Sequence, residues 1–156
     1  MTLRAVVGFG SNLGDRLSTL RTARRLLEVV ARVEATSRVY ETAPVGPPQP
    51  DYLNAAALVA FQGTPGRLME ALLDIEARLG RVRAERNGPR TVDLDLLWIE
   101  GLRVESPQLV VPHPRLSERA FALAPMLELV PDAIDPGTGT AYVVPAGDAR
   151  ATDDLL

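Results

Sequence analysis

The chain has 156 residues, the length of one domain that can bury a sizeable apolar core without a disulfide or a structural metal. It contains no Cys and a single His, which excludes disulfide frameworks, thiolate metal sites, Cys nucleophiles and multi-His metal sites. All 17 basic residues are Arg, so the Lys-dependent P-loop, protein-kinase and Schiff-base sites are excluded, and a net charge of −3 argues against bulk electrostatic binding of nucleic acid or an anionic membrane.

The first half of the chain predicts a strand, a helix and two further strands. Residues 3–9 form a short apolar run that ends in a Gly-rich turn, where Asp15 is the expected N-cap of a helix. Apolar residues then recur at helical spacing over 17–30. The β-branched run 33–41 and the apolar run 52–61 are predicted strands, separated by a Pro-rich loop over 42–50.

The second half predicts two more helices and one long strand. A helix begins near Pro65 and ends at Gly80, followed by an irregular basic stretch and a strand over 91–99. A turn at 100–101 leads to a weak hairpin partner around 102–104. A third helix is expected over 117–129 with Ser117 as N-cap, then a short strand near 142–144 and a frayed tail over about 146–156.

The order strand, helix, strand, strand, helix, strand predicts the fold class. It is the ferredoxin-like split βαβ pattern of an α+β protein, in which helices pack on one face of an antiparallel sheet. A doubly wound parallel sheet is the alternative, but two consecutive strands with no helix between them favour the antiparallel arrangement. We expect a single domain over 1–156, with a short extra hairpin or C-terminal strand.

The segment Gly88-Pro89-Arg90-Thr91-Val92-Asp93-Leu94-Asp95 is the most informative about chemistry. Side chains alternate along a strand, so Val92, Leu94, Leu96 and Trp98 are expected to face the helices and the two Asp the other way, with Cα atoms about 6.5–7 Å apart. Neighbouring carboxylates repel each other, and a divalent cation such as Mg²⁺ would relieve the repulsion. The alternative is a strand with an ordinary solvated face.

Four arginines lie just upstream, at 81, 83, 86 and 90. A guanidinium offers fixed bidentate donors for phosphate oxygens, although a solvated loop is the alternative. Together with the paired Asp, the cluster predicts a site for a metal-bound polyphosphate.

Two loops and a lone histidine are further candidates. Gly8-Phe9-Gly10-Ser11-Asn12-Leu13-Gly14 does not have the dinucleotide-binding spacing, and either a tight structural turn or a substrate contact explains it. In the loop and strand over 42–54, Tyr52 and Asn54 share a face and could supply an aromatic wall and an amide to a planar heterocycle. His113 fits either a structural or a catalytic role.

These blocks together resemble one family. Gly10 to Asp15, Thr42 to Asn54, the Gly-Pro-Arg-x-x-Asp-x-Asp segment, and Val111-Pro112-His113 with Arg119 and Phe121 closely resemble 6-hydroxymethyl-7,8-dihydropterin pyrophosphokinase of folate biosynthesis, up to about Pro131. The resemblance implies an ATP- and Mg²⁺-dependent reaction with two metal ions. In it the pterin hydroxymethyl oxygen attacks the β-phosphorus of ATP and AMP is released.

The resemblance also implies roles for individual residues. It implies metal binding by Asp93 and Asp95; phosphate handling by Arg81, Arg83 and Arg90; pterin contacts by Thr42, Ala43, Val45, Tyr52, Asn54 and Phe121; and nucleotide contacts by Glu76, Leu96, His113 and Arg119. A small pocket lined by Leu96, Leu109, Val110 and His113 is then expected to hold the adenine. The chain departs from common members at Asn87, Gln108 and Pro114.

Two other functions compete with this interpretation. A nucleotidyltransferase also pairs a Gly-Ser turn with an Asp-x-Asp strand, but keeps the two close in sequence. A ferredoxin-like RNA-binding module would need exposed aromatic residues and a basic face, whereas the chain is 4% aromatic and acidic overall. We therefore expect a cytoplasmic, monomeric enzyme with small-molecule substrates, without a nucleic-acid partner or a membrane segment.

Overall fold

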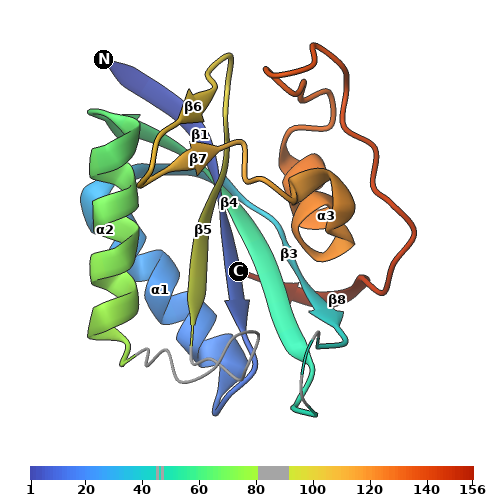
Figure 1. The fold of residues 1–156 in the computed structure, drawn as a ribbon. Coiled ribbons are helices and arrows are strands. Elements are labelled where there is room, and N and C mark those ends of the chain that lie inside the picture. Colours follow the sequence, from blue (N-terminus) through green and yellow to red (C-terminus); the bar gives the residue numbers. More distant parts are fainter. Residues whose placement is uncertain (45, 47, 81–91) are drawn as a thin grey trace.

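The computed structural model describes residues 1–44, 46, 48–80 and 92–156 (Figure 1). In chain order its elements are β1 (Thr2–Ser11), α1 (Arg16–Val30), β2 (Arg32–Thr36), β3 (Arg38–Thr42), β4 (Tyr52–Gln62), α2 (Pro65–Arg78), β5 (Asp93–Ile99), β6 (Val104–Glu105), β7 (Val110–Val111), a 3₁₀ turn (Leu116–Glu118), α3 (Ala120–Leu129) and β8 (Arg150–Leu155).

One antiparallel sheet organises the molecule. Its strand order is β5-β1-β4-β3-β8, and β2 also pairs with β4. The first four strands of this order, β5-β1-β4-β3, reproduce the ferredoxin-like arrangement, so the predicted α+β class is confirmed. The extra hairpin also exists, but its strands are β6 and β7, which pair with each other and not with β5.

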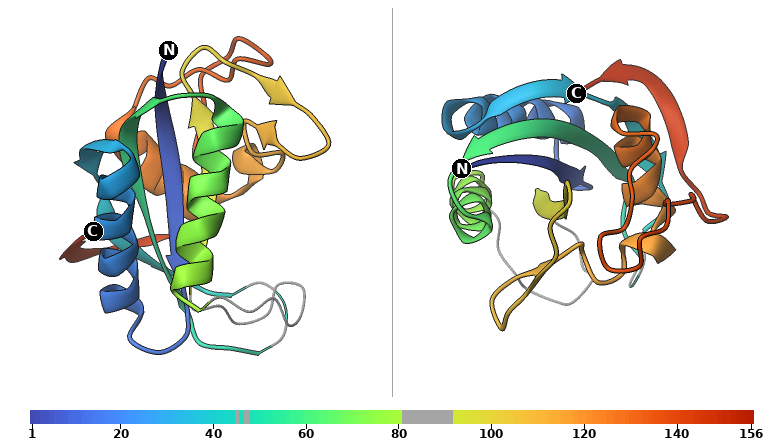
Figure 2. Two further views of the ribbon diagram at one scale, coloured as in Figure 1. Left: turned by 90° about the vertical axis from the view of Figure 1, so that its left-hand side faces the viewer. Right: turned by 90° about the horizontal axis from the view of Figure 1, so that it is seen from above.

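Helices cover both faces of the sheet, as the two views of Figure 2 show. Leu20 of α1 and Leu68 of α2 belong to the larger core cluster on one face. Leu123 and Met126 of α3 belong to a second cluster on the opposite face. The prediction that the helices share one face is therefore correct for α1 and α2 and wrong for α3.

Local signals fix the two longer helices. The Asp15 side chain caps α1 by accepting a hydrogen bond from the Ser18 N–H at 3.1 Å, as predicted. The Thr64 side chain caps α2 in the same way, with Pro65 in the first turn. The prediction of Ser117 as the cap of the third helix is wrong, because that residue lies in the 3₁₀ turn and α3 begins after Arg119.

The predicted strand over 33–41 is divided in two at Ser37. The Ser37 hydroxyl accepts a hydrogen bond from the Ala56 N–H at 2.9 Å and donates one to the Arg38 carbonyl at 2.7 Å. The side chain thus takes up main-chain groups that a continuous strand would pair with its neighbour.

A bulge in β5 changes which way its last residues face. Val7 lies opposite Leu96 but Val6 lies opposite Trp98, so Leu97 is an extra residue in the pairing with β1. Up to the bulge the alternation holds, and Val92, Leu94 and Leu96 enter the α1/α2 core as predicted. Beyond it Trp98 joins the α3 core, so its predicted orientation is wrong.

The last residues of the chain are ordered, so the expected fraying over 146–156 is also wrong. Strand β8 pairs with β3, and the Thr152 hydroxyl donates a hydrogen bond to the Val39 carbonyl at 2.7 Å. Leu156 is only 4% exposed and belongs to the larger core cluster. The strand expected near 142–144 is reduced to a single bridge between Ile134 and Ala141.

No helix in the described part of the chain combines the length and the apolar character needed to cross a bilayer.

Candidate active site

The two aspartates of β5 lie beside glycines of the central strand. Asp93 is paired with Gly10 of β1 and Asp95 with Gly8, and both Asp side chains are partly buried. Since Leu94 enters the α1/α2 core, the flanking carboxylates lie on the opposite face of the sheet, as the alternation predicted. Gly10 is also paired on its other side with Asn54 of β4, so Asp93, Gly10 and Asn54 form one row across three strands.

Gly10 leaves a hollow in the middle of this row. A Cβ at that position would lie 3.2 Å from Asn54 Oδ1, 3.6 Å from Tyr52 Cδ1 and 3.9 Å from Asp93 Cβ. A side chain there would fill the space between the carboxylate and the amide. A glycine at this position leaves room for the close approach of the Asn54 amide.

The amide side of the row is held rigidly. Asn54 Nδ2 donates a hydrogen bond to Thr42 Oγ1 at 2.7 Å, and both side chains are buried. The bond orients the Asn54 amide so that its oxygen is directed to the hollow beside Gly10. With the partly buried Tyr52 ring, these residues form the face that the sequence predicted for a planar heterocycle.

The turn after β1 secures the neighbouring loop. Asn12, which is 1% exposed, donates from Nδ2 to Gln49 Oε1 at 2.6 Å and to the Pro50 carbonyl at 3.1 Å. Arg16 Nη1 donates to the Asp51 carbonyl at 2.8 Å. These contacts favour the structural interpretation of the Gly-Ser-Asn turn, because its polar side chain holds a loop far away in the sequence.

His113 approaches the site from the segment between β7 and α3. Its main-chain N–H donates to the carbonyl of the bulge residue Leu97 at 2.9 Å. Burial lowers the pKa of His113, and the positive charges of Arg119 and Arg115 lower it further, while Asp93 acts in the opposite sense. The imidazole is therefore neutral near pH 7 and lies within electrostatic reach of both Asp93 and Arg119.

Arg119 and Phe121 form a second contact beside the site. The Arg119 guanidinium carbon lies 5.5 Å from the centre of the Phe121 ring, a cation–π geometry. Phe121 also packs against the core under α3. The stacking restricts the guanidinium to a region next to the histidine.

Glu76 and Leu96, two residues implied as nucleotide contacts, have side chains that are buried within the fold. Glu76 is 3% exposed, and its Oε2 accepts the Leu94 N–H at 2.7 Å on the outer edge of β5. This bond supports the strand that carries both aspartates. The Leu96 side chain is buried in the α1/α2 core, so a nucleotide could meet only its main-chain groups.

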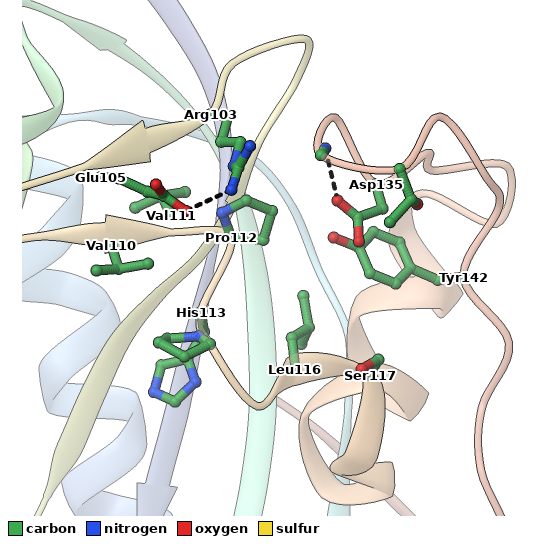
Figure 3. Close-up of a pocket in the computed structure, with 13 residues that line it drawn as sticks. Arg103, Glu105, Val110, Val111, Pro112, His113, Leu116, Ser117, Asp135 and Tyr142 are labelled. Carbon is green, nitrogen blue, oxygen red and sulfur yellow. Dashed lines mark hydrogen bonds and ion pairs between the residues drawn. The ribbon is translucent and has the colours of Figure 1, made fainter.

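A cavity of about 370 Å³ opens between the β6–β7 hairpin, the 3₁₀ turn and the loop over 134–142 (Figure 3). It contains two residues of the expected adenine pocket, Val110 and His113, whereas Leu109 packs against the main core. The cavity is lined by Arg103, Glu105, Val110, Val111, Pro112, His113, Pro114, Leu116, Ser117, Asp135, Gly137, Thr138 and Tyr142.

Some implied site residues lie outside the part of the chain that the structure describes. They are Arg81, Arg83, Arg90 and Val45. Thr42, Ala43, Tyr52 and Asn54 are brought together at the ends of β3 and β4, and Asp93 joins them through the row at Gly10.

Comparison with known proteins identifies the family. The family model for 7,8-dihydro-6-hydroxymethylpterin-pyrophosphokinase matches residues 6–131. The chain belongs to this family.

Similar pyrophosphokinases support this assignment. The Synechocystis enzyme is 41% identical over 141 residues, 89% of this chain and 72% of its own length. The Methylorubrum extorquens enzyme is 45% identical, covering 84% and 85%, and the Bacillus subtilis enzyme is 46% identical, covering 80% and 77%. The protein is therefore an enzyme that transfers a pyrophosphoryl group to hydroxymethyldihydropterin in folate biosynthesis.

Solved structures confirm the pyrophosphokinase fold. An HPPK-DHPS crystallised in complex with substrates matches 89% of the chain with a TM-score of 0.70 at 14% identity. An HPPK-DHPS triple mutant from Plasmodium falciparum matches 90% with a TM-score of 0.68 at 15% identity. The chain spans 42% and 43% of those two solved chains.

Proposed function

We propose that Asp93 and Asp95 hold Mg²⁺ together with the phosphates of ATP. Carboxylate oxygens are the hard ligands that Mg²⁺ prefers. Among the described residues no group of three or more His, Asp or Glu side chains is arranged for a metal, so water and phosphate oxygens would complete the coordination. The partly buried pair beside Gly8 and Gly10 fits this role, because no glycine side chain obstructs the carboxylates.

The pterin would bind on the amide side of the same row. Asn54 Oδ1 is directed to the hollow at Gly10 and can accept a hydrogen bond from a ring N–H or amino group. Tyr52 and Phe121 supply apolar contact, while Thr42 orients the amide and Ala43 offers main-chain groups. Val45 is included on the resemblance alone, since it lies outside the described residues.

The observation that carries this proposal is the row Asp93, Gly10, Asn54. It joins a carboxylate suited to a metal-bound phosphate and an amide suited to a heterocycle, with one open position between them. Two substrates bound on either side would meet at that position, which is the geometry that transfer between them requires.

The reaction then depends mainly on positioning and charge. The pterin hydroxymethyl oxygen attacks the β-phosphorus of ATP, the bond to the bridging oxygen of the α-phosphate breaks, and AMP leaves. Asp93 and Asp95 would hold the Mg²⁺, whose charge would offset that of the phosphate oxygens. Arg119, close to the neutral His113, would contribute a fixed positive charge to the nucleotide side. Arg81, Arg83 and Arg90 are proposed to bind the phosphates, on the resemblance alone.

Substitution of the aspartates tests the metal assignment. Asp93→Asn and Asp95→Asn should each lower kcat at least about 100-fold, equivalent to about 3 kcal/mol of transition-state stabilisation, with little change in thermal stability. Calorimetry of ATP binding with and without Mg²⁺ provides a readout apart from turnover, and the metal-dependent part should disappear in both variants. Wild-type turnover in either variant would show that the metal is held elsewhere.

Analysis of the reaction products distinguishes pyrophosphoryl transfer from the competing nucleotidyltransferase activity. Formation of AMP from ATP and 6-hydroxymethyl-7,8-dihydropterin is expected, whereas a nucleotidyltransferase would release pyrophosphate. We also propose that the chain acts as a single-domain, cytoplasmic monomer that does not bind nucleic acid. Sedimentation tests the monomeric state, and an RNA filter-binding experiment tests the absence of nucleic-acid binding.

A further inference from the structure

The segment that leads into β8 contacts both ends of the loop between β3 and β4. Asp148 Oδ2 accepts a hydrogen bond from the Ala43 N–H at 2.9 Å, just after β3 ends at Thr42. Arg150 Nη2 lies 3.4 Å from Asp51 Oδ2, just before β4 begins at Tyr52. The other Asp148 oxygen pairs with Arg150 Nε at 3.1 Å, which joins the two contacts into one network.

This network is built on an anchored strand. Arg150 is opposite Glu41 and Ala151 opposite Tyr40 in the pairing of β8 with β3. The Thr152 hydrogen bond to Val39 and the buried Leu156 hold β8 farther along. Asp148 and Arg150 are therefore supported by a strand that is itself held in place, as positioning residues require.

The Asp148 carboxylate acts where the sheet stops pairing. The Ala43 N–H lies one residue beyond β3, and a carboxylate acceptor makes a strong, charge-assisted bond with it. Next to it, Thr42 orients the Asn54 amide through the 2.7 Å bond. A shift of Ala43 would therefore be transmitted to the amide through one peptide unit and one hydrogen bond.

The side chains of this network are largely exposed to solvent, so the network can influence local conformation more than global stability. The side chains of Asp51, Asp148 and Arg150 are 41%, 48% and 60% exposed. Ion pairs at such exposure contribute little to global stability. They can still hold Ala43 and Asp51, beside the ends of β3 and β4, in one conformation, which lowers the entropy that a ligand next to these residues must remove on binding.

We propose that Asp148 and Arg150 are positioning residues for the pterin. Both lie beyond residues 6–131, the part matched by the family model. The inference rests on the proposed function, because it takes Thr42 and Asn54 as part of the pterin site. Through Ala43 and Asp51, the two residues hold the neighbouring ends of β3 and β4, and with them Thr42 and Asn54, in the position that binds the pterin.

Steady-state kinetics with two variants at one position tests the inference. Asp148→Ala removes the bonds to Ala43 and to Arg150 and should raise the KM for 6-hydroxymethyl-7,8-dihydropterin roughly five- to tenfold, the effect of one charge-assisted hydrogen bond at a half-exposed site. Asp148→Asn keeps an oxygen for the Ala43 N–H but loses the ion pair, so a rise of about two- to threefold is expected. The KM for ATP and the Tm should stay at wild-type values in both.

The control removes the same charge at a position a few residues farther along, within β8. Asp153 is an exposed carboxylate of β8, and Asp153→Ala should leave every parameter unchanged. In the wild type, raising the salt concentration should increase the pterin KM by screening the Arg150 pairs, and this dependence should be weaker in Asp148→Asn.

The same experiment separates failure of the inference from failure of the pterin site. If Asp148→Ala behaves like Asp153→Ala, or raises both KM values while lowering the Tm, the positioning role is wrong. Asn54→Ala, measured in parallel, tests the site itself. An unchanged pterin KM in that variant would overturn the proposed site, whereas a raised KM there with a normal Asp148→Ala would overturn only the positioning role.

Discussion

The most direct test of the site's geometry is to fill the hollow at Gly10. Gly10 does not need a left-handed backbone, so alanine can adopt its conformation without strain. The new methyl would lie 3.2 Å from Asn54 Oδ1, which cannot retreat freely because Asn54 Nδ2 is bonded to Thr42 at 2.7 Å. The substitution thus occupies the hollow and leaves its walls in place.

The expected magnitudes separate activity from stability. Alanine in a strand gains about 0.5–1 kcal/mol over glycine, which offsets part of the tight contact with Asn54, so the free energy of unfolding should change by no more than about 1–2 kcal/mol. Steric overlap of the substrate with the added methyl should weaken binding of the transition state by about 1–3 kcal/mol. This corresponds to a fall in kcat/KM of roughly five- to 150-fold.

AMP formation and thermal unfolding measured on the same preparation give both quantities. Gly66→Ala is a matched control, because a Cβ there meets nothing within 4 Å and the residue is exposed in the first turn of α2. That variant should gain about 0.5–1 kcal/mol of stability and keep full activity. Wild-type kcat/KM in Gly10→Ala would refute the placement of the reacting groups in this hollow.

Two further predictions concern His113 and Leu156. Burial lowers the pKa of His113 below its ordinary 6.5, so the unfolded chain binds the proton more readily and the free energy of unfolding should fall as the pH drops below about 6.5. His113→Asn should flatten this part of the pH profile in chemical denaturation, and an identical slope would contradict the assignment. Leu156→Ala should cost about 2–4 kcal/mol of stability because the side chain is 4% exposed in the main core, with kcat unchanged where the variant is folded. A Tm equal to that of the wild type would show that β8 is dispensable.

Features that depend on neighbouring residues could be predicted from the sequence. The Asp15 cap, the start of α2 at Pro65 and the common face of Asp93 and Asp95 follow from local hydrogen bonding and strand alternation. The family motifs added the identity of the substrates. Tyr52 and Asn54 share a face of β4, as the alternation predicted, because the pairing of β4 with β1 continues without a shift to the start of the strand.

Features that depend on distant partners could not be predicted. Nothing local marks Leu97 as the extra residue of a bulge, since only the pairing with β1 reveals it. Serine is a common helix N-cap, yet Ser117 lies within a 3₁₀ turn, next to the buried Leu116. The sequence around Asp148 is rich in charged and small residues, which resembles a disordered tail until β3 and Ala43 are seen beside it.

The position of β8 has a consequence for how the protein behaves at high concentration. An open sheet invites another copy to add a strand wherever an outer strand is long and apolar. Here the outermost strand beyond β3 carries Arg150, Asp153 and Asp154, and its side chains are mostly exposed. On the opposite border, the Leu94 N–H of β5 is already bound by Glu76. The borders formed by β8 and β5 thus discourage intermolecular strand addition, and removal of residues 150–156 would expose β3, with its buried Val39, as a new template for aggregation.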